Sequence, residues 1–293
     1  MEKEIPKIHF NKNQSLGIEV MNFAQLRNKL LVQSKDHDPF SPHRLKFFLV
    51  LVITKNTYSH FVDFKSYKLL KGSALFVAKN QVHHFTKELL TADGFCIVFD
   101  SLFVGKDYFL SGNLKFNKLY NYHIETPVIH QKQMGEDSLI GVAWKLYSEY
   151  IFPNSFAKSE ILCALLNVLL LKAERTKELQ AANNIPIQKL EIFNKFKDLL
   201  ESNYTATRSS KFYAQKLFIS YKLLNEIVKK LTGKTVKAFI DDFVAIEIKR
   251  YLVATSLSIK EISYETGFEE PSNMVKFFKK NTHTTPLQFR QQK

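Results

Sequence analysis

The chain has 293 residues, of which 45% are hydrophobic and 24% charged, so it can bury two cores and is not disordered by composition. Lysine and arginine number 42 against 28 aspartate and glutamate. The resulting formal net charge of +14 favours a polyanionic partner, nucleic acid before anionic membrane. Two cysteines are too few for a disulfide framework, and no apolar run reaches the roughly 20 residues that span a bilayer. The N-terminal segment lacks the apolar core of a secretory signal, so we expect a cytoplasmic protein with no membrane partner.

Short β-rich runs fill the chain between residues 45 and 99 and predict a sandwich or barrel. Side chains alternate between the two faces of a strand, which puts Tyr58 and His60 on an otherwise apolar face. Of the adjacent His83 and His84, at most one can point inward. If the interior holds a small-molecule effector, its candidate pocket residues are Tyr58, His60, His84 and Cys96. The alternative interpretation of His60 and His84 is that each is a hydrogen-bonded core histidine.

Two helices are expected after the strands, over residues 138–150 and 156–178, with a break at Pro153 and Asn154. The second carries apolar residues at three- and four-residue spacing, more of them than one small barrel needs. One interpretation is a helix packed on its own barrel, and the other is a dimer interface; both can be true. The interface would be formed by Ile161, Leu165, Val168 and Leu169.

The polar segment TKELQAANNIP, residues 176–186, ends in proline and predicts a linker. It separates a domain over residues 1–175 from a domain over residues 187–293, in which no strand pattern appears and the basic excess is denser. The predicted fold class is therefore α+β with two domains. The first is a β-barrel with a helical pair, and the second is all-α.

The segment 211–235 predicts a helix-turn-helix motif. A short helix contains the small residue Ala214, a tight turn follows at Phe218 and Ile219, and Ser220 is a favourable N-cap for an amphipathic second helix. The outward face of that second helix carries Lys222, Asn225, Glu226, Lys229 and Lys230.

A second motif of the same kind is predicted over residues 258–290. Ser258 caps a helix that ends at Gly267, the residue type best able to adopt a positive φ, and Phe268 follows as a plug. Pro271 then opens another helix, because proline is tolerated in a first turn. Its exposed face carries Ser272, Asn273, Lys276, Lys279 and Lys280.

Between the two motifs, residues 235–254 show helical spacing of apolar residues without a breaker. A helix of about 20 residues is about 30 Å long, close to the roughly 34 Å that separates successive major grooves on one face of B-DNA. A rod of this length could therefore hold two recognition helices in adjacent grooves.

With these motifs the sequence resembles the AraC/XylS family of bacterial transcription regulators over about 100 residues, from Lys189 to Arg290. The most specific part is IKEISYETGF (259–268), followed by FFKK (277–280) and by Thr285 and Pro286. His283 departs from the family pattern, which usually has glycine there. The resemblance implies a DNA-binding domain with two helix-turn-helix motifs joined by a long helix.

We choose the expected DNA contacts by two criteria: the residue matches a contact position of the family pattern, and it lies on the exposed face of its helix. The expected base-reading residues are Lys222, Asn225, Glu226, Ser272, Asn273 and Lys276, and the expected phosphate contacts are Ser220, Lys229, Lys230, Lys279 and Lys280. A merely solubilising basic face is the alternative interpretation of these lysines. Their grouping on the outer faces of two recognition helices favours DNA.

The resemblance also implies a cupin-like N-terminal domain that senses a small molecule and forms a homodimer, and it implies RNA polymerase as a partner of an activator. No catalytic motif and no cofactor site is predicted. A cupin-type metal-dependent enzyme or metal sensor with an accessory DNA-binding domain is the alternative. The nine histidines include no His-x-His pair, which disfavours a metal site. A basic peripheral membrane protein is a third possibility, disfavoured because the apolar sides of the basic helices are needed for a core.

Overall fold

The computed structural model describes residues 4–9, 16–33, 38–100, 103, 119–124, 126–130, 135, 137–153, 156–180 and 187–292. The chain divides into two compact units. The N-terminal unit is Lys7–Asn184, and the C-terminal unit is Ile185–Lys293 together with Met1–Pro6. Every helix in the described part of the chain is too short or too polar to cross a membrane.

Two antiparallel-rich sheets build the N-terminal unit, as the β-rich runs predicted. Within the described residues, one five-stranded sheet has the order β1-β3-β8-β5-β6 and the other has the order β10-β7-β4-β9-β2. The elements are β1 (Lys7–Ile8), β2 (Ile18–Asn22), α1 (Phe23–Gln33), β3 (His43–Leu45), β4 (Phe48–Lys55), β5 (Tyr58–Val62), β6 (Lys65–Leu69), β7 (Ser73–Val77), β8 (Val82–His84), the short 3-10 helix η1 (Lys87–Leu90), β9 (Asp93–Phe99) and β10 (Val128–His130).

Strand β4 is buried on both faces and therefore separates two cores. Leu49 and Leu51 belong to the core that also contains Tyr58 and Val62 of the opposite sheet. Val50 and Val52, on the other face of the same strand, pack with residues of the helical layer. This explains why residues 47–53, FFLVLVI, are continuously apolar rather than alternating.

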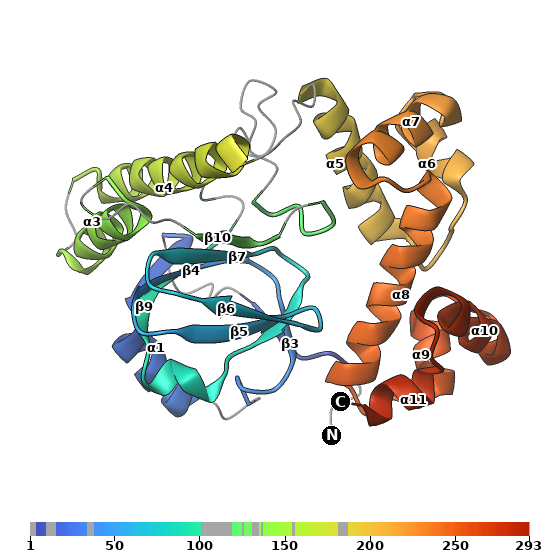
Figure 1. The fold of residues 1–293 in the computed structure, drawn as a ribbon, viewed down its shortest axis with the longest axis horizontal. Coiled ribbons are helices and arrows are strands. Elements are labelled where there is room, and N and C mark those ends of the chain that lie inside the picture. Colours follow the sequence, from blue (N-terminus) through green and yellow to red (C-terminus); the bar gives the residue numbers. More distant parts are fainter. Residues whose placement is uncertain are drawn as a thin grey trace. The chain divides into compact units, whose positions relative to one another are not determined.

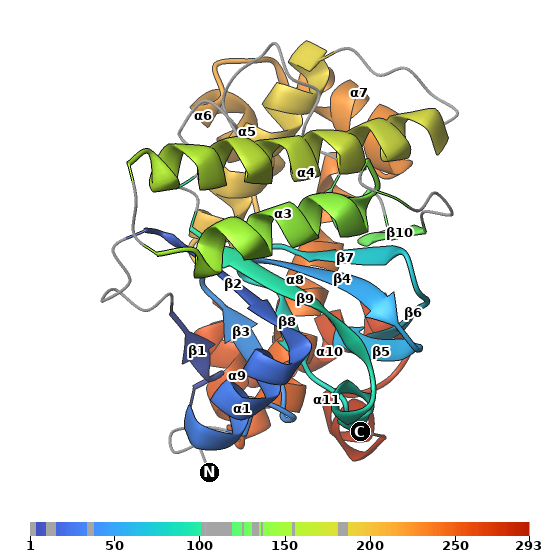
Figure 2. The ribbon, with the colours of Figure 1, turned by 90° about the vertical axis from the view of Figure 1, so that its left-hand side faces the viewer.

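Helices α3 (Leu139–Ile151) and α4 (Lys158–Gln180) form that helical layer, and Figure 2 shows them lying across the sheet that contains β7, β4 and β9. Ser138 caps α3, where its side chain accepts a hydrogen bond from the backbone N–H of Gly141. Helix α4 begins two residues later than predicted, because Ala157 has a left-handed backbone with φ of 58°.

Helix α4 also runs further than predicted, through the first five residues of the expected linker, 176–180. The reason is a tertiary contact: Lys177 is buried and its ammonium group donates a hydrogen bond to the carbonyl of Thr126. The remaining part of the predicted linker, residues 181–186, lies outside the described residues.

In the described residues of the C-terminal unit, helices are the only regular secondary structure. Its helices are α5 (Ile187–Asn203), α6 (Ser210–Lys216), α7 (Tyr221–Thr232), α8 (Val236–Ala254), α9 (Ile259–Glu265), α10 (Pro271–Thr282) and α11 (Pro286–Gln291). Phe193 and Phe196 of α5 pack edge-on or tilted against Phe239 of α8, with ring centroids 5.3 and 5.7 Å apart. This unit therefore has an aromatic core of its own.

Candidate DNA-binding surface

The first helix-turn-helix motif consists of α6 and α7, joined by the turn at Phe218, whose φ is 55°. Ser220 is the N-cap of α7 and its Oγ accepts a hydrogen bond from the backbone N–H of Leu223 at 3.1 Å. Leu224, Ile227 and Val228 are buried, as is Leu231. Gly233 ends the helix with φ of 72°. Of the predicted outward residues, Lys222, Glu226, Lys229 and Lys230 are exposed, whereas Asn225 is half-buried.

The second motif consists of α9 and α10. Ser258 and Glu261 form a reciprocal capping box at the start of α9, and Gly267 takes a positive φ of 76° in the turn. Pro271 is the first residue of α10, and Met274 and Phe278 are fully buried. The predicted N-cap at Ser258 and the left-handed turn at Gly267 are confirmed.

The two motifs lie at the two ends of α8, as Figure 1 shows. Helix α8 has 19 residues, which corresponds to about 28 Å along its axis. The predicted connecting rod is therefore present, with a length close to the spacing of successive major grooves.

Most of the predicted base-reading residues are exposed on the recognition helices. Lys222 and Glu226 lie on the exposed side of α7, and Ser272, Asn273 and Lys276 lie on the exposed side of α10. Glu226 is held by Lys189 of α5, whose Nζ is 2.6 Å from Oε1, and this hydrogen bond lowers the pKa of Glu226. The second carboxylate oxygen of Glu226, Oε2, keeps its acceptor sites.

Asn225 is placed differently from its neighbours. It is half-buried, and its Oδ1 accepts a hydrogen bond from the backbone N–H of Val236 at 3.1 Å. Its side-chain oxygen therefore closes the first turn of α8 instead of facing outward as predicted. Nothing in the local sequence signals this bond, because the two residues are 11 positions apart.

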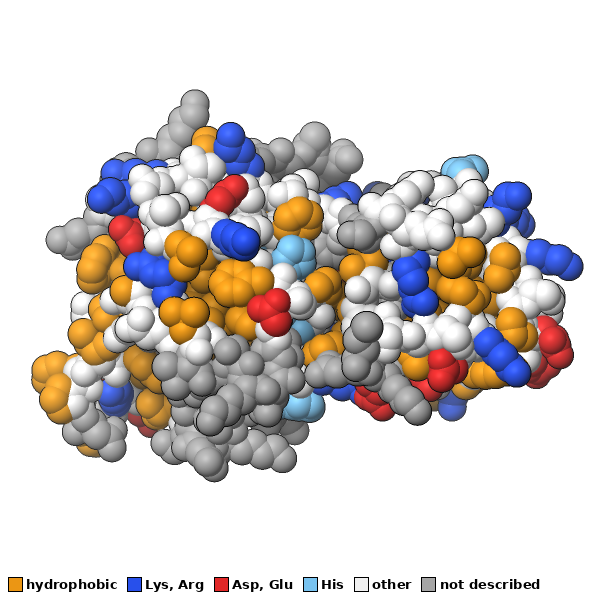
Figure 3. Space-filling model, turned by 90° about the horizontal axis from the view of Figure 1, so that it is seen from below, with side chains coloured by type: hydrophobic (Ala, Val, Ile, Leu, Met, Phe, Trp, Pro, Cys, Tyr) orange, Lys and Arg blue, Asp and Glu red, His pale blue; other side chains and the backbone are white. Residues whose placement is uncertain are grey.

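The predicted phosphate contacts Lys229, Lys230, Lys279 and Lys280 are exposed in the last turns of α7 and α10. The Ser220 oxygen already accepts the hydrogen bond that caps α7. Its hydroxyl can therefore contact a phosphate oxygen only by donating its proton. In the view of Figure 3, lysine and arginine side chains are scattered among hydrophobic, acidic and uncharged ones. On that face the basic charge is dispersed rather than gathered.

The candidate effector residues of the N-terminal unit do not form one pocket. Tyr58 and His60 are fully buried between the sheets, with Tyr58 Oη and His60 Nδ1 2.9 Å apart. His84 is on the opposite face, stacked on Phe61 with ring centroids 4.6 Å apart, so its inward assignment was wrong. His83 points inward instead, because β8 pairs with β3 and β5 in the register that puts it beside His43 and Val62.

Cys96 is buried in the opposite sheet, where burial raises the pKa of its thiol to about 12. Among the described residues, no group of three or more histidine, cysteine, aspartate or glutamate side chains has the arrangement of a metal site.

The predicted dimer residues on α4 divide into two kinds. Ile161 and Val168 are 41% and 40% exposed and face away from the sheet. Leu169 is fully buried in the core beneath α4, so its assignment to an interface was wrong. Leu165 lies between these extremes and is partly covered by the same core.

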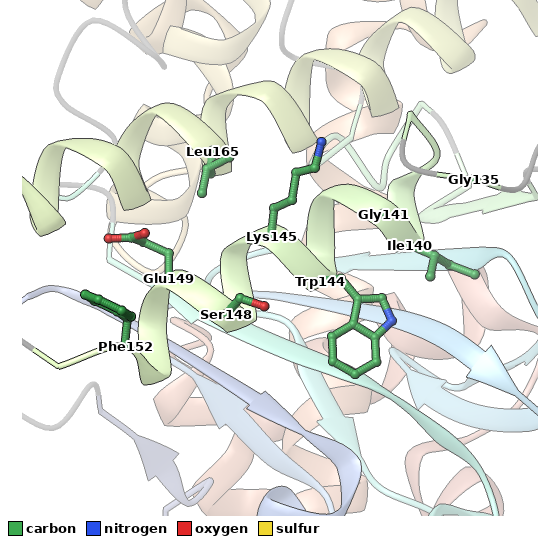
Figure 4. Close-up of a pocket in the computed structure, with 9 residues that line it drawn as sticks. All are labelled: Gly135, Ile140, Gly141, Trp144, Lys145, Ser148, Glu149, Phe152 and Leu165. Atoms are coloured by element: carbon green, nitrogen blue, oxygen red, sulfur yellow. The ribbon is translucent and has the colours of Figure 1, made fainter.

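A cleft of about 740 Å³ lies beside Leu165, between α3 and α4. Figure 4 shows that its lining residues come from α3, from Leu165 and from the turn at Gly135, with Leu165 pointing toward α3. Trp144 and Phe152 provide apolar surface, and Lys145, Ser148 and Glu149 provide polar groups. No local pattern in the sequence indicates this cleft.

Comparison with known proteins places the C-terminal motifs in a family. Residues 213–292 match a family model described as a helix-turn-helix domain. A curated protein of Escherichia coli K12, the uncharacterized HTH-type transcriptional regulator YijO, is 23% identical over 101 residues, or 34% of this chain and 36% of that protein. The chain thus matches about a third of the length of this relative.

Solved structures are similar to one or both units. ToxT from Vibrio cholerae aligns with 93% of this chain and 97% of its own, at 16% identity and a TM-score of 0.47. The C-terminal domain of the two-component response regulator yesN from Fusobacterium nucleatum aligns with 32% of this chain and 93% of its own, at 27% identity and a TM-score of 0.30.

Proposed function

We propose, from the premise that the C-terminal region is a helix-turn-helix domain of the AraC type, that this protein is a sequence-specific DNA-binding regulator of transcription. The observation that supports this most strongly is the pair of motifs at the two ends of α8, each with an exposed basic recognition helix. No catalytic step is part of the proposal.

The proposed mechanism divides the exposed residues by role. Lys229, Lys230, Lys279 and Lys280 contact phosphates, which positions the protein without reading sequence. Asn273 pairs with adenine, and Lys222 and Lys276 pair with guanine. Ser272 adds a hydroxyl at the start of α10, close to backbone N–H groups that no side chain caps.

The salt dependence of duplex binding tests this division. With the four phosphate contacts named above, affinity for a selected duplex should fall roughly 10²-fold between 50 and 200 mM salt. Lys279→Ala should weaken binding to all sequences alike and flatten the salt slope by about one unit. Asn273→Ala should instead cost about 1–3 kcal/mol at particular base pairs and leave the slope unchanged.

A control variant comes from the N-terminal unit. Lys65 is an exposed lysine on β6, and Lys65→Ala removes the same charge far along the chain from either motif. It should change neither the slope nor the specificity. A salt-independent affinity of the parent protein would contradict the proposed function.

We propose further that the protein is an activator that acts as a homodimer and contacts RNA polymerase. The support for a dimer is the exposed apolar pair Ile161 and Val168 on α4, which a second copy would cover. The family resemblance supports the activator role and RNA polymerase as partner.

We also propose that a small-molecule effector binds in the cleft between α3 and α4 and not in the barrel interior. The cleft is concave, largely apolar and rimmed by a few polar groups, as ligand sites are. Its position beside α4 would let a ligand change the proposed dimer surface.

Trp144 provides the test, because it is the single tryptophan of the chain and lines the cleft. Screening small amphipathic compounds by tryptophan fluorescence should find ligands that shift its emission. Ser148→Phe should fill the cleft and abolish the response. A compound that shifts the emission of parent and variant alike would contradict this placement.

A further inference from the structure

The loop that leads into the first motif touches the turn of the second motif. This loop, residues 205–208, lies between α5 and α6, and the turn at Gly267 lies between α9 and α10. A Cβ atom added to Gly267 would lie 2.1 Å from the carbonyl oxygen of Thr205. The two backbones are therefore in direct contact, and α8 is not the sole connection between the motifs.

Arg208 makes the polar part of this contact. Its Nη2 donates hydrogen bonds to the carbonyl oxygens of Thr266 at 2.8 Å and of Gly267 at 3.2 Å. Thr266 is the C-cap of α9, where carbonyl groups have no partner within the helix. Arg208 thus satisfies the end of the first helix of the second motif from the loop that leads into the first motif.

The same guanidinium group packs on aromatic rings of the second motif. It lies 3.6 Å from the ring centroid of Phe268 and 5.5 Å from that of Phe277, which is part of the second recognition helix, α10. Burial lowers the pKa of Arg208. The planar guanidinium stacks on the Phe268 ring while its Nη2 bonds both carbonyls, and the compact, strongly hydrated ammonium of lysine is not equivalent to it at such a stacked site.

We propose that Arg208 is a positioning residue that fixes the second recognition helix relative to the first, and thereby sets the spacing of base pairs the protein accepts. This inference rests on the proposed function. Arg208 reads no base itself. Arg208 holds the turn that precedes α10, and α8 connects the two motifs along the chain. Two connections between the motifs restrict a relative rotation that a single connection would allow.

The test uses the full-length chain and a duplex selected by it from a random-sequence pool. The duplex is then remade with one base pair inserted or removed between the two groove contacts. The parent should lose about tenfold or more in affinity on either change, which is comparable to a mismatched base pair. Arg208→Ala and Arg208→Lys should bind the selected duplex less tightly and should lose most of this discrimination between spacings.

The matched control is Tyr213→Phe. The Tyr213 hydroxyl donates a hydrogen bond to the carbonyl of Thr207 in the same loop, at 2.8 Å, but does not contact the second motif. Tyr213→Phe should destabilise the 205–208 loop but leave the preference for the selected base-pair spacing unchanged. The inference is overturned if Arg208→Lys keeps the parent's spacing profile, or if Tyr213→Phe loses it equally. If the parent selects no duplex, the proposed function fails instead.

Discussion

His60 and His83 face each other across two neighbouring strands, with Nε2 of His60 2.9 Å from Nδ1 of His83. Tyr58 closes the other side of the His60 ring at Nδ1. All three side chains are buried between the sheets, and the ring of Phe85 packs edge-on against that of His60. An apolar core thus contains a hydrogen-bonded chain of polar rings, which is stable only while each ring remains uncharged.

We therefore expect the N-terminal unit to lose stability in acid. Burial, assisted by the nearby His84 and His43, lowers the pKa of His60 to about 3 from its ordinary 6.5. Below pH 6.5 the His60 side chain binds a proton in the unfolded chain but stays neutral in the folded chain. The contribution of His60 to stability is therefore fully present above pH 6.5 and decreases as the pH drops toward 3. The loss from this group should be about 2 kcal/mol between pH 6.5 and 5.

Urea unfolding followed by Trp144 fluorescence at several pH values measures this loss. His60→Gln should reduce the dependence of unfolding free energy on pH by about one proton, whatever it does to stability at neutral pH. His130 is exposed on β10, and His130→Gln is the control. An equal pH dependence in the parent and in His60→Gln would contradict the assignment.

Two glycines with the same backbone conformation should respond differently to alanine. Gly233 and Gly267 have φ of 72° and 76°, but a Cβ on Gly233 meets no atom within 4 Å, whereas one on Gly267 meets the backbone of Thr205 at 2.1 Å. Gly233→Ala should cost about 1–2 kcal/mol for the left-handed conformation alone. Gly267→Ala should cost at least about 2 kcal/mol more, because two backbone segments must separate. Thermal unfolding of both variants compares them, and equal costs would show that the loop yields freely.

Charged substitutions on α4 should separate the proposed interface from the core. Ile161→Asp and Val168→Asp alter exposed positions, so each should convert dimers to monomers in sedimentation with little change in unfolding. Leu169→Asp buries a charge in the core and should destabilise the N-terminal unit by more than about 3 kcal/mol. A dimer that survives both exposed substitutions would place the interface elsewhere.

Residues 185–293 should fold alone and bind DNA as a monomer. Their aromatic core around Phe193, Phe196 and Phe239 lies within that unit. If the N-terminal unit forms the dimer, the full-length chain should bind a duplex with two half-sites more tightly than this piece, because tethering makes the second contact intramolecular. Sedimentation and titration of both proteins on one duplex decide the matter. A dimeric C-terminal piece, or equal affinities, would refute it.

The local patterns of the sequence determined the β-rich segment, helices α3 and α8 and both motifs. Ser258 and Glu261 stand three residues apart, the spacing of a capping box, and Gly267 follows the helix where a left-handed residue is needed. The helical spacing of apolar residues over 235–254 predicted the extent of α8. Such features depend on neighbours within a few positions, so the recognition helices and most of their exposed residues could be predicted.

Only the tertiary structure decided which partner each polar residue finds. His83 rather than His84 points inward because the pairing of β8 with β3 and β5 sets its register, and two adjacent histidines give no local hint of it. Asn225 accepts a hydrogen bond from the backbone N–H of Val236, and Leu169 packs in the core beneath α4. Arg208 donates a hydrogen bond to the carbonyl of Thr266, which is 58 residues away in the sequence. These contacts join segments distant in sequence, and their partners exist only once the helices have packed.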